Sequence, residues 1–205
     1  MITIIDYGVG NLFSLQSSFK ALNIETVVSG EPEVLRKAER LVLPGVGAFR
    51  DASEKLFSSG LADLVCQKAA EGTPLLGICL GMQMLFEKSY EYGEYKGLAL
   101  LKGEVRPIAE AIPKDLKIPH IGWNKLLYPS DRARHTLFAS LPENPYVYFV
   151  HSYHAVNCED SLIASTEYGA SLTAAVAKAN VMGCQFHPEK SGDVGLSILR
   201  AFCTI

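Results

Sequence analysis

The sequence predicts an α/β fold in which a doubly wound, mixed sheet carries an antiparallel extension. In roughly the first half of the chain, short apolar segments alternate with helix-like segments. This is the order of a parallel sheet with right-handed crossovers and helices on both faces. From Gly97 onward, short segments rich in β-branched and aromatic residues are punctuated by prolines, which is typical of antiparallel strands.

The first part of the chain is expected to alternate strands and helices. Residues 2–5 form a short apolar run typical of a buried strand, and residues 12–22 place four apolar side chains at helical spacing. Further strands are expected over residues 24–28, 40–43 and 73–76, and further helices over residues 31–38, 52–57, 62–71 and 82–88. Ligands of such sheets bind at the carboxyl ends of the strands, where three loops fall, around Gly8, Gly45 and Cys79.

The second part is expected to be mostly strands. The predicted segments are residues 98–106, 117–127, 146–153, 162–166, 173–177 and 181–186. Asn180 is expected to turn the last hairpin. A closing helix is predicted over residues 191–202, with Ser191 as its N-cap.

Composition limits the classes of function. The chain has 205 residues, of which 48% are hydrophobic, enough for one core and a single domain over residues 1–205. The net charge is −3 and no basic stripe occurs, so a nucleic-acid partner is not expected. Five cysteines without a CxxC pair indicate a reducing, cytoplasmic setting. No apolar run approaches the ~18 residues of a membrane span, and the N-terminus resembles a strand more than a signal peptide.

The segment Gly77-Ile78-Cys79-Leu80-Gly81 joins an apolar run to a helix-like segment. Cys79 is therefore expected at a sharp strand-to-helix turn, a nucleophile elbow with cysteine in place of serine. Glycines flank it because so tight a turn leaves no room for a neighbouring Cβ. The N–H groups of a helix N-terminus favour the reactive thiolate. The alternative is a small core hydrophobe, which is how we interpret the other cysteines: Cys66, Cys158, Cys184 and Cys203.

A second group of reactive side chains lies near the C-terminus, in His187-Pro188-Glu189-Lys190. Pro188 stops the preceding strand because it has no N–H. His187 and Glu189 are two residues apart and project to the same side of an extended chain. The carboxylate fixes the imidazole tautomer and supports its protonated form, which suits a general base for a thiol. Alone, this pair is more often structural; together with Cys79 it predicts a catalytic triad.

Acyl transfer also needs hydrogen-bond donors for an oxyanion. The backbone N–H of Leu80, directly after the nucleophile, is one candidate. A second is the N–H of Val46 in the loop Pro44-Gly45-Val46-Gly47, where glycines let the peptide plane rotate. Read alone, this loop is equally consistent with a plain turn.

These motifs resemble those of the class I, or triad, glutamine amidotransferases, and more closely the glutaminase subunits of imidazole glycerol phosphate synthase in histidine biosynthesis. Besides residues 77–83, four segments carry the resemblance in the family's order: Asp6-Tyr7-Gly8-Val9-Gly10-Asn11, Pro44-Gly45-Val46-Gly47, Pro119-His120-Ile121-Gly122-Trp123-Asn124 and His187-Pro188-Glu189-Lys190-Ser191. The resemblance implies a flavodoxin-like, doubly wound mixed sheet in one glutamine amidotransferase domain. It implies no cofactor and no metal ion.

The resemblance also implies residue roles. Cys79 would attack the side-chain amide of glutamine, His187 would move the protons, and Glu189 would orient His187. Glutamine would be bound by Gly47, Gln83, Glu91 and the backbone around Ser152 and Tyr153. The partner would be a (β/α)8-barrel cyclase subunit in a heterodimer, which receives the ammonia. We expect four residues at that interface: Asn11, Trp123, Tyr148 and Lys190. From sequence alone, Trp123 and Tyr148 are as readily core aromatics.

Three other hypotheses remain open at this point. The chain could serve another synthase as its glutaminase subunit, although the Ile-Gly-Trp-Asn segment argues against this. It could be a non-catalytic regulatory homologue, although no triad member is missing. It could be a different cysteine hydrolase, such as a peptidase, although the placement of His-Pro-Glu disfavours this.

Overall fold

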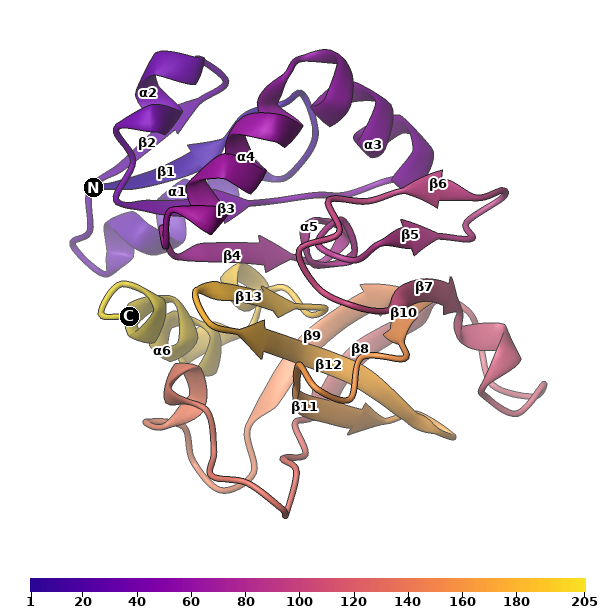
Figure 1. Cartoon of the computed structure of the whole chain (residues 1–205). Helices are drawn as coiled ribbons and strands as arrows, with labels where there is room; N and C mark the ends of the chain where they lie inside the picture. The colour runs from indigo at the N-terminus through magenta and orange to yellow at the C-terminus, as the bar shows by residue number, and fades with distance from the viewer.

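A seven-stranded sheet lies at the centre of the computed structural model, which describes all residues 1–205 (Figure 1). Its strand order is β11-β12-β13-β4-β3-β1-β2. The strands from β13 to β2 pair in parallel, whereas β12 pairs antiparallel with both β13 and β11. The predicted doubly wound mixed sheet with an antiparallel extension is therefore confirmed.

The elements have the following bounds. The central sheet contains β1 (Ile2–Ile5), β2 (Thr26–Ser29), β3 (Arg40–Leu43), β4 (Leu75–Ile78), β11 (Leu162–Glu167), β12 (Ser171–Lys178) and β13 (Val181–Cys184). A four-stranded sheet contains β10 (Tyr153–Val156), β7 (Glu104–Pro107), β5 (Lys88–Ser89) and β6 (Tyr95–Lys96), and a two-stranded sheet contains β8 (His120–Lys125) and β9 (Tyr146–His151). The helices are α1 (Leu12–Ala21), α2 (Pro32–Arg36), α3 (Phe49–Ser58), α4 (Leu61–Ala70), α5 (Leu80–Gln83) and α6 (Gly192–Phe202), with 3-10 turns η1 (Ile108–Glu110), η2 (Thr136–Phe138) and η3 (Pro188–Lys190).

Alternate residues of the central strands face two separate helical layers, as the period of two in a strand requires. Ile5 and Leu41 belong to an apolar cluster with α2, α3 and α4. Ile4 and Val42 belong to a second cluster with α1 and α6. Figure 1 shows α3 and α4 above the sheet and α6 below it. With both faces covered, only the ends of the strands are left for a site.

Several sequence-based boundaries are wrong. The strand expected over residues 117–127 spans only His120–Lys125, and the helix expected over residues 52–57 begins at Phe49. The helix expected over residues 82–88 stops at Gln83, because the N–H groups of Leu98 and Leu100 bind the carbonyls of Met84 and Leu85 at 2.7 and 2.9 Å. A continuing helix would need those carbonyls for its own bonds. The segment 98–106 is a strand only from β7 onward, and the strand expected at residue 24 begins two residues later.

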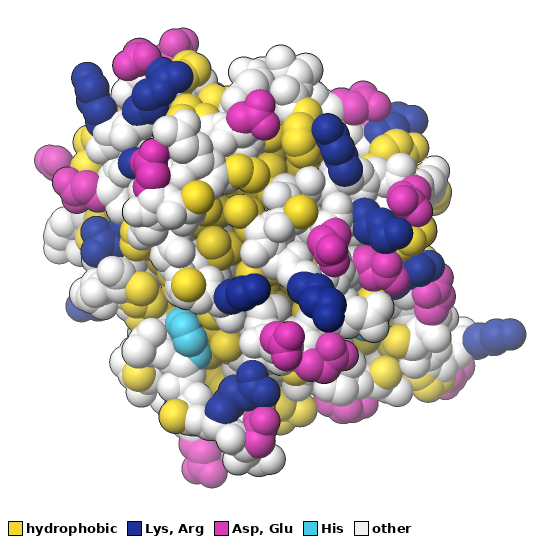
Figure 2. Space-filling model, viewed as in Figure 1, with side chains coloured by type: hydrophobic (Ala, Val, Ile, Leu, Met, Phe, Trp, Pro, Cys, Tyr) yellow, Lys and Arg dark blue, Asp and Glu magenta, His cyan; other side chains and the backbone are white.

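Charged side chains of both signs share the face of the molecule that is turned to the viewer in Figure 2. On the face shown in Figure 2, Lys and Arg side chains are interspersed with Asp and Glu. None of the helices combines the length and the apolar character needed to cross a bilayer.

Candidate active site

Cys79 lies at a strained turn between β4 and α5. Its backbone has φ 56° and ψ −113°, a conformation rarely adopted by a non-glycine residue and one that costs free energy. The turn is tied to the neighbouring strand β13, because the N–H of Cys79 donates to the carbonyl of Cys184 at 2.7 Å. This is the sharp strand-to-helix geometry that the sequence predicts for a nucleophile elbow.

The flanking glycines are required by close backbone contacts. A Cβ on Gly81 would lie 1.9 Å from the carbonyl oxygen of Leu43, and one on Gly77 would lie 2.6 Å from the carbonyl oxygen of Gly81. The expectation that the turn leaves no room for a Cβ at Gly77 or Gly81 is therefore confirmed.

His187 and Glu189 reach the same sheet edge from β13, the parallel neighbour of β4. His187 Nδ1 lies 2.7 Å from Glu189 Oε1, and the two side chains are only 3% and 1% exposed. Since a carboxylate only accepts, Nδ1 carries the hydrogen, and Nε2 is left for Cys79 in the neutral ring. The chain exit is fixed further by the bond from the N–H of His187 to the carbonyl of Tyr148 at 3.0 Å.

Ser191 supports this exit in a way that the sequence analysis missed. It stands at the N-cap position of α6 but makes no capping bond. Its hydroxyl instead donates to the carbonyl of His187 at 2.7 Å and accepts the N–H of Tyr148 at 3.0 Å. The predicted capping role is therefore wrong, because these two backbone groups occupy the hydroxyl.

The electrostatic environment of His187 favours its protonated form. Burial alone lowers the pKa of this imidazole, but hydrogen bonds and charge interactions with Cys79 and Glu189 outweigh burial and raise the pKa. A raised pKa favours transfer of a proton from a neighbouring thiol to the imidazole. The arrangement can therefore accept the proton of the thiol when the sulfur attacks.

A cavity of about 280 Å³ opens over Cys79 and His187. The other predicted residues that line it are Val46, Gly47, Leu80, Gln83, Glu91, Ser152 and Tyr153. The two oxyanion candidates and all five proposed substrate contacts are thus brought together. The lining residues that sequence reasoning did not select are Pro119, Val150 and His151. Pro119 could have been selected from the sequence, because it is the first residue of the quoted segment that ends at Asn124.

Glu91 is placed in the cavity by a contact with the neighbouring helix. Its Oε2 accepts the backbone N–H of Phe49 at 2.6 Å, at the N-terminus of α3. Burial raises the pKa of the Glu91 carboxyl, partly offset by this bond. A carboxylate in this position can pair with a cationic group of a ligand.

Three of the four predicted interface residues form one group on the outside of the β8–β9 sheet. Trp123 and Tyr148 are cross-strand partners with ring centroids 6.1 Å apart, and Lys190 Nζ lies 5.9 Å from the Tyr148 ring. Trp123 is 52% exposed, so the alternative of a core tryptophan is wrong. The side chain of Asn11, the fourth predicted residue, caps α1 by accepting the N–H of Ser14 at 3.2 Å, and its place at the interface stays a prediction.

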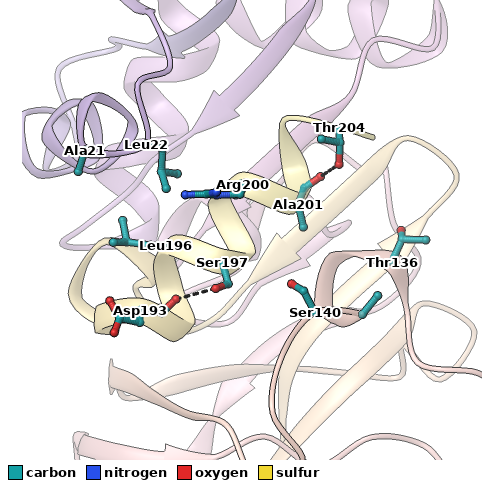
Figure 3. A pocket seen from close by; sticks show the side chains of 11 residues that line it. Ala21, Leu22, Thr136, Ser140, Asp193, Leu196, Ser197, Arg200, Ala201 and Thr204 are labelled. Atoms are coloured by element: carbon teal, nitrogen blue, oxygen red, sulfur yellow. Dashed lines mark hydrogen bonds between the residues drawn. The ribbon is translucent and has the colours of Figure 1, made fainter.

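A larger groove of about 670 Å³ lies between α1, η2 and α6 and carries no comparable chemistry (Figure 3). Two of its hydroxyls are bound to nearby backbone: Ser197 donates to the carbonyl of Asp193 and Thr204 to that of Ala201, both at 2.8 Å. The smaller cavity is therefore the candidate active site, although it is not the largest hollow.

Comparison with known proteins agrees with this geometry. The family model described as glutamine amidotransferase class-I matches residues 3–204. The chain belongs to the class-I glutamine amidotransferases. Within this family it is 53% identical to the imidazole glycerol phosphate synthase subunit HisH of Lactococcus lactis, over 98% of this chain and 96% of the relative. It is 48% identical to the HisH subunit of Sulfurimonas denitrificans, over 98% and 97% of the two chains.

Solved structures of this family share the fold. The structure described as PurLQS from Thermotoga maritima superposes with a TM-score of 0.74 at 17% identity, covering 99% of this chain and 97% of the other. A crystal structure described as a glutamine amidotransferase gives a TM-score of 0.75 at 20% identity, covering 98% of each chain. The fold is thus maintained where most of the sequence differs.

Proposed function

We propose that this chain is the glutaminase subunit of imidazole glycerol phosphate synthase, which hydrolyses glutamine and passes the ammonia to a cyclase subunit. The single observation that carries the proposal is the meeting of Cys79 with the buried His187–Glu189 pair at the cavity. The HisH relatives, which match nearly the full chain, support the choice of synthase.

Acylation follows from the geometry. His187 takes the proton of the Cys79 thiol, and the thiolate attacks the side-chain carbonyl carbon of glutamine. The oxyanion accepts hydrogen bonds from the backbone N–H groups of Leu80 and Val46. When this intermediate collapses, His187 returns the proton to nitrogen, the C–N bond breaks, and ammonia leaves a γ-glutamyl thioester on Cys79.

Deacylation reuses the same groups. His187 takes a proton from a water molecule as that water attacks the thioester, and the proton passes to the departing sulfur. The C–S bond breaks and the γ-carboxyl group of glutamate forms, releasing one proton when it ionises. Glu189 keeps the ring oriented through both halves of the reaction, as the charged partner of an imidazolium.

The partner that we propose is a (β/α)8-barrel cyclase subunit, which uses the ammonia to make imidazole glycerol phosphate and an aminoimidazole carboxamide ribotide. Its proposed docking surface is the outer side of β8 and β9, with Trp123, Tyr148 and Lys190. Exposed Ile121 and Tyr146 extend this apolar surface, and Val150 on the same strand side lines the cavity. A partner seated here would lie directly beside the nucleophile. We propose a cytoplasmic location, supported by the five free cysteines.

The test is glutamate release from the purified chain, alone and with the cyclase subunit and its nucleotide substrate. Cys79→Ser should abolish release, whereas Cys66→Ser, a half-buried cysteine outside the cavity, should leave it unchanged. Mass spectrometry of the quenched reaction should find the γ-glutamyl adduct on Cys79. Release that survives Cys79→Ser, or no release by the folded parent under any condition, would overturn the proposal.

A further inference from the structure

Gln185 is a buried residue that the sequence analysis did not single out. It lies between β13 and His187, is fully buried, and its backbone N–H donates to the carbonyl of Ala174 at 2.8 Å. Its side-chain Nε2 lies 3.8 Å from the sulfur of Cys79. This is hydrogen-bond distance for sulfur, so a second side chain besides His187 approaches the nucleophile.

The direction of this amide is fixed by a chain of hydrogen bonds that begins at a backbone carbonyl. The oxygen of Tyr153 can only accept, so the group of Gln83 that faces it at 3.2 Å is the NH₂. The same NH₂ lies 3.0 Å from the side chain of Gln185, which must therefore present its oxygen. The NH₂ of Gln185 is then left to face sulfur. His151 Nδ1, 2.8 Å from the Tyr153 oxygen, anchors the start of the chain.

A donor held in this way distinguishes between the two forms of the nucleophile. A thiol sulfur is a weak acceptor, whereas a thiolate carries a full negative charge, and hydrogen bonds to charged groups contribute more than neutral ones. The site is buried, where such bonds are stronger. The amide therefore stabilises the thiolate more than the thiol.

We propose that Gln185 is a catalytic residue beside the triad, which donates an N–H to the Cys79 thiolate and is held in that orientation by Gln83. The inference deepens the proposed glutaminase function and rests on it. The inference also limits the role of Gln83 in substrate binding, because its NH₂ group already donates to Tyr153 and Gln185. Gln83 can offer glutamine only its side-chain oxygen, as an acceptor for an N–H group of the substrate.

Two variants separate the donor from the packing. Gln185→Met keeps the length of the side chain and removes the donor. Gln185→Glu keeps an oxygen for Gln83 and places a second acceptor against the sulfur. Gln67→Met, on an exposed position of α4, is the matched control. The readout is the pH dependence of Cys79 alkylation by iodoacetamide, followed on the Cys79 peptide by mass spectrometry.

For Gln185→Met we expect alkylation of Cys79 about tenfold slower at neutral pH, with the midpoint of the pH profile moved upward, because one charge-assisted bond is lost. Gln185→Glu should move it further. With glutamine and the cyclase subunit, kcat should fall while KM changes little. If Gln185 only filled space, its substitution would lower the melting temperature and leave the pH profile of alkylation unchanged.

A parent-like profile in either folded variant would overturn the inference. If Gln185→Met does not fold, Gln185→Glu decides alone, since it preserves the contact with Gln83. Alkylation needs neither glutamine nor the partner. Failure of the parent to release glutamate would therefore refute the proposed function, and a parent-like alkylation profile would refute the role of Gln185.

Discussion

Glu189 Oε1 and His187 Nδ1 lie 2.7 Å apart in surroundings from which water is almost entirely excluded. Such a bond holds the imidazole in one orientation, with its second nitrogen free for the thiol. The other carboxylate oxygen, Oε2, is buried without a partner. The only side-chain hydrogen bond of the Glu189 carboxylate is therefore the one to the imidazole of His187.

The first prediction removes the charge of this carboxylate and keeps its shape. Glu189→Gln should lower kcat for glutamine hydrolysis about 10²-fold or more, because the amide no longer stabilises the imidazolium. The measurement is glutamate release by the complex at saturating glutamine. Glu143→Gln, at an exposed loop position, should keep parental activity. A loss of less than threefold in the Glu189 variant would contradict the assigned role.

The second prediction concerns stability and pH. Because the pKa of His187 is raised in the folded chain by Cys79 and Glu189 against the effect of burial, the folded state binds the proton more tightly than the unfolded chain. The resulting stabilisation of the folded state is complete below about pH 6.5, the ordinary pKa of histidine. It is lost as the pH rises through the raised pKa of His187 in the folded chain.

Melting temperatures across this pH range test the point. The difference between the parent and His187→Gln should be largest near about pH 6 and should shrink at higher pH. His135→Gln serves as the control, because burial lowers the pKa of His135 and the trend should have the opposite sign. A His187 difference that stays constant with pH would count against the ion pair.

The third prediction tests the oxyanion donor in the Val46 loop. Val46→Pro removes the N–H and should reduce kcat by ~10²–10³ if that donor meets the oxyanion. Val46→Ala keeps the N–H and trims a side chain that is 43% exposed, so it should behave like the parent. Equal activities of the two variants would exclude this N–H from the reaction.

The fourth prediction concerns the docking surface. Trp123→Ala should weaken binding of the cyclase subunit at least tenfold, since a large aromatic at the centre of an interface is a typical hot spot. It should hardly change the melting temperature of the free chain, because half of the side chain is already exposed. Isothermal titration calorimetry measures the first effect. Ile205→Ala, at an exposed apolar residue beside Arg40 at the amino end of β3, is the control and should bind like the parent.

The parallel part of the fold could be predicted from sequence because its strands are short, largely apolar runs between amphipathic helices. The strand Arg40–Leu43 was predicted with its observed bounds. The end of α5 could not be predicted, because it depends on contacts of Met84 and Leu85 with residues more than a dozen positions later. Helical spacing within a segment carries no information about such contacts.

Cys79, His187 and Val46 could be selected because they lie in compact motifs at strand ends, whereas the substrate contacts that line the cavity were implied by the family resemblance. Gln185 was missed for the opposite reason. A glutamine inside an apolar strand has no periodicity or spacing that marks it, and its contact with Cys79 spans 106 positions of sequence. Ser191 shows the same limit, since its hydroxyl could have capped α6 but serves His187 and Tyr148 instead.

The positive φ of Cys79 has a consequence for the ranking of side chains at that position. A protein with alanine at a given position is normally more stable than one with glycine, because alanine loses less backbone entropy on folding. At φ 56° and ψ −113° the order should be inverted, since only glycine adopts this backbone without penalty. Cys79→Gly should therefore melt at a higher temperature than Cys79→Ala. The nucleophile therefore occupies a position where a non-glycine residue lowers the thermal stability of the fold.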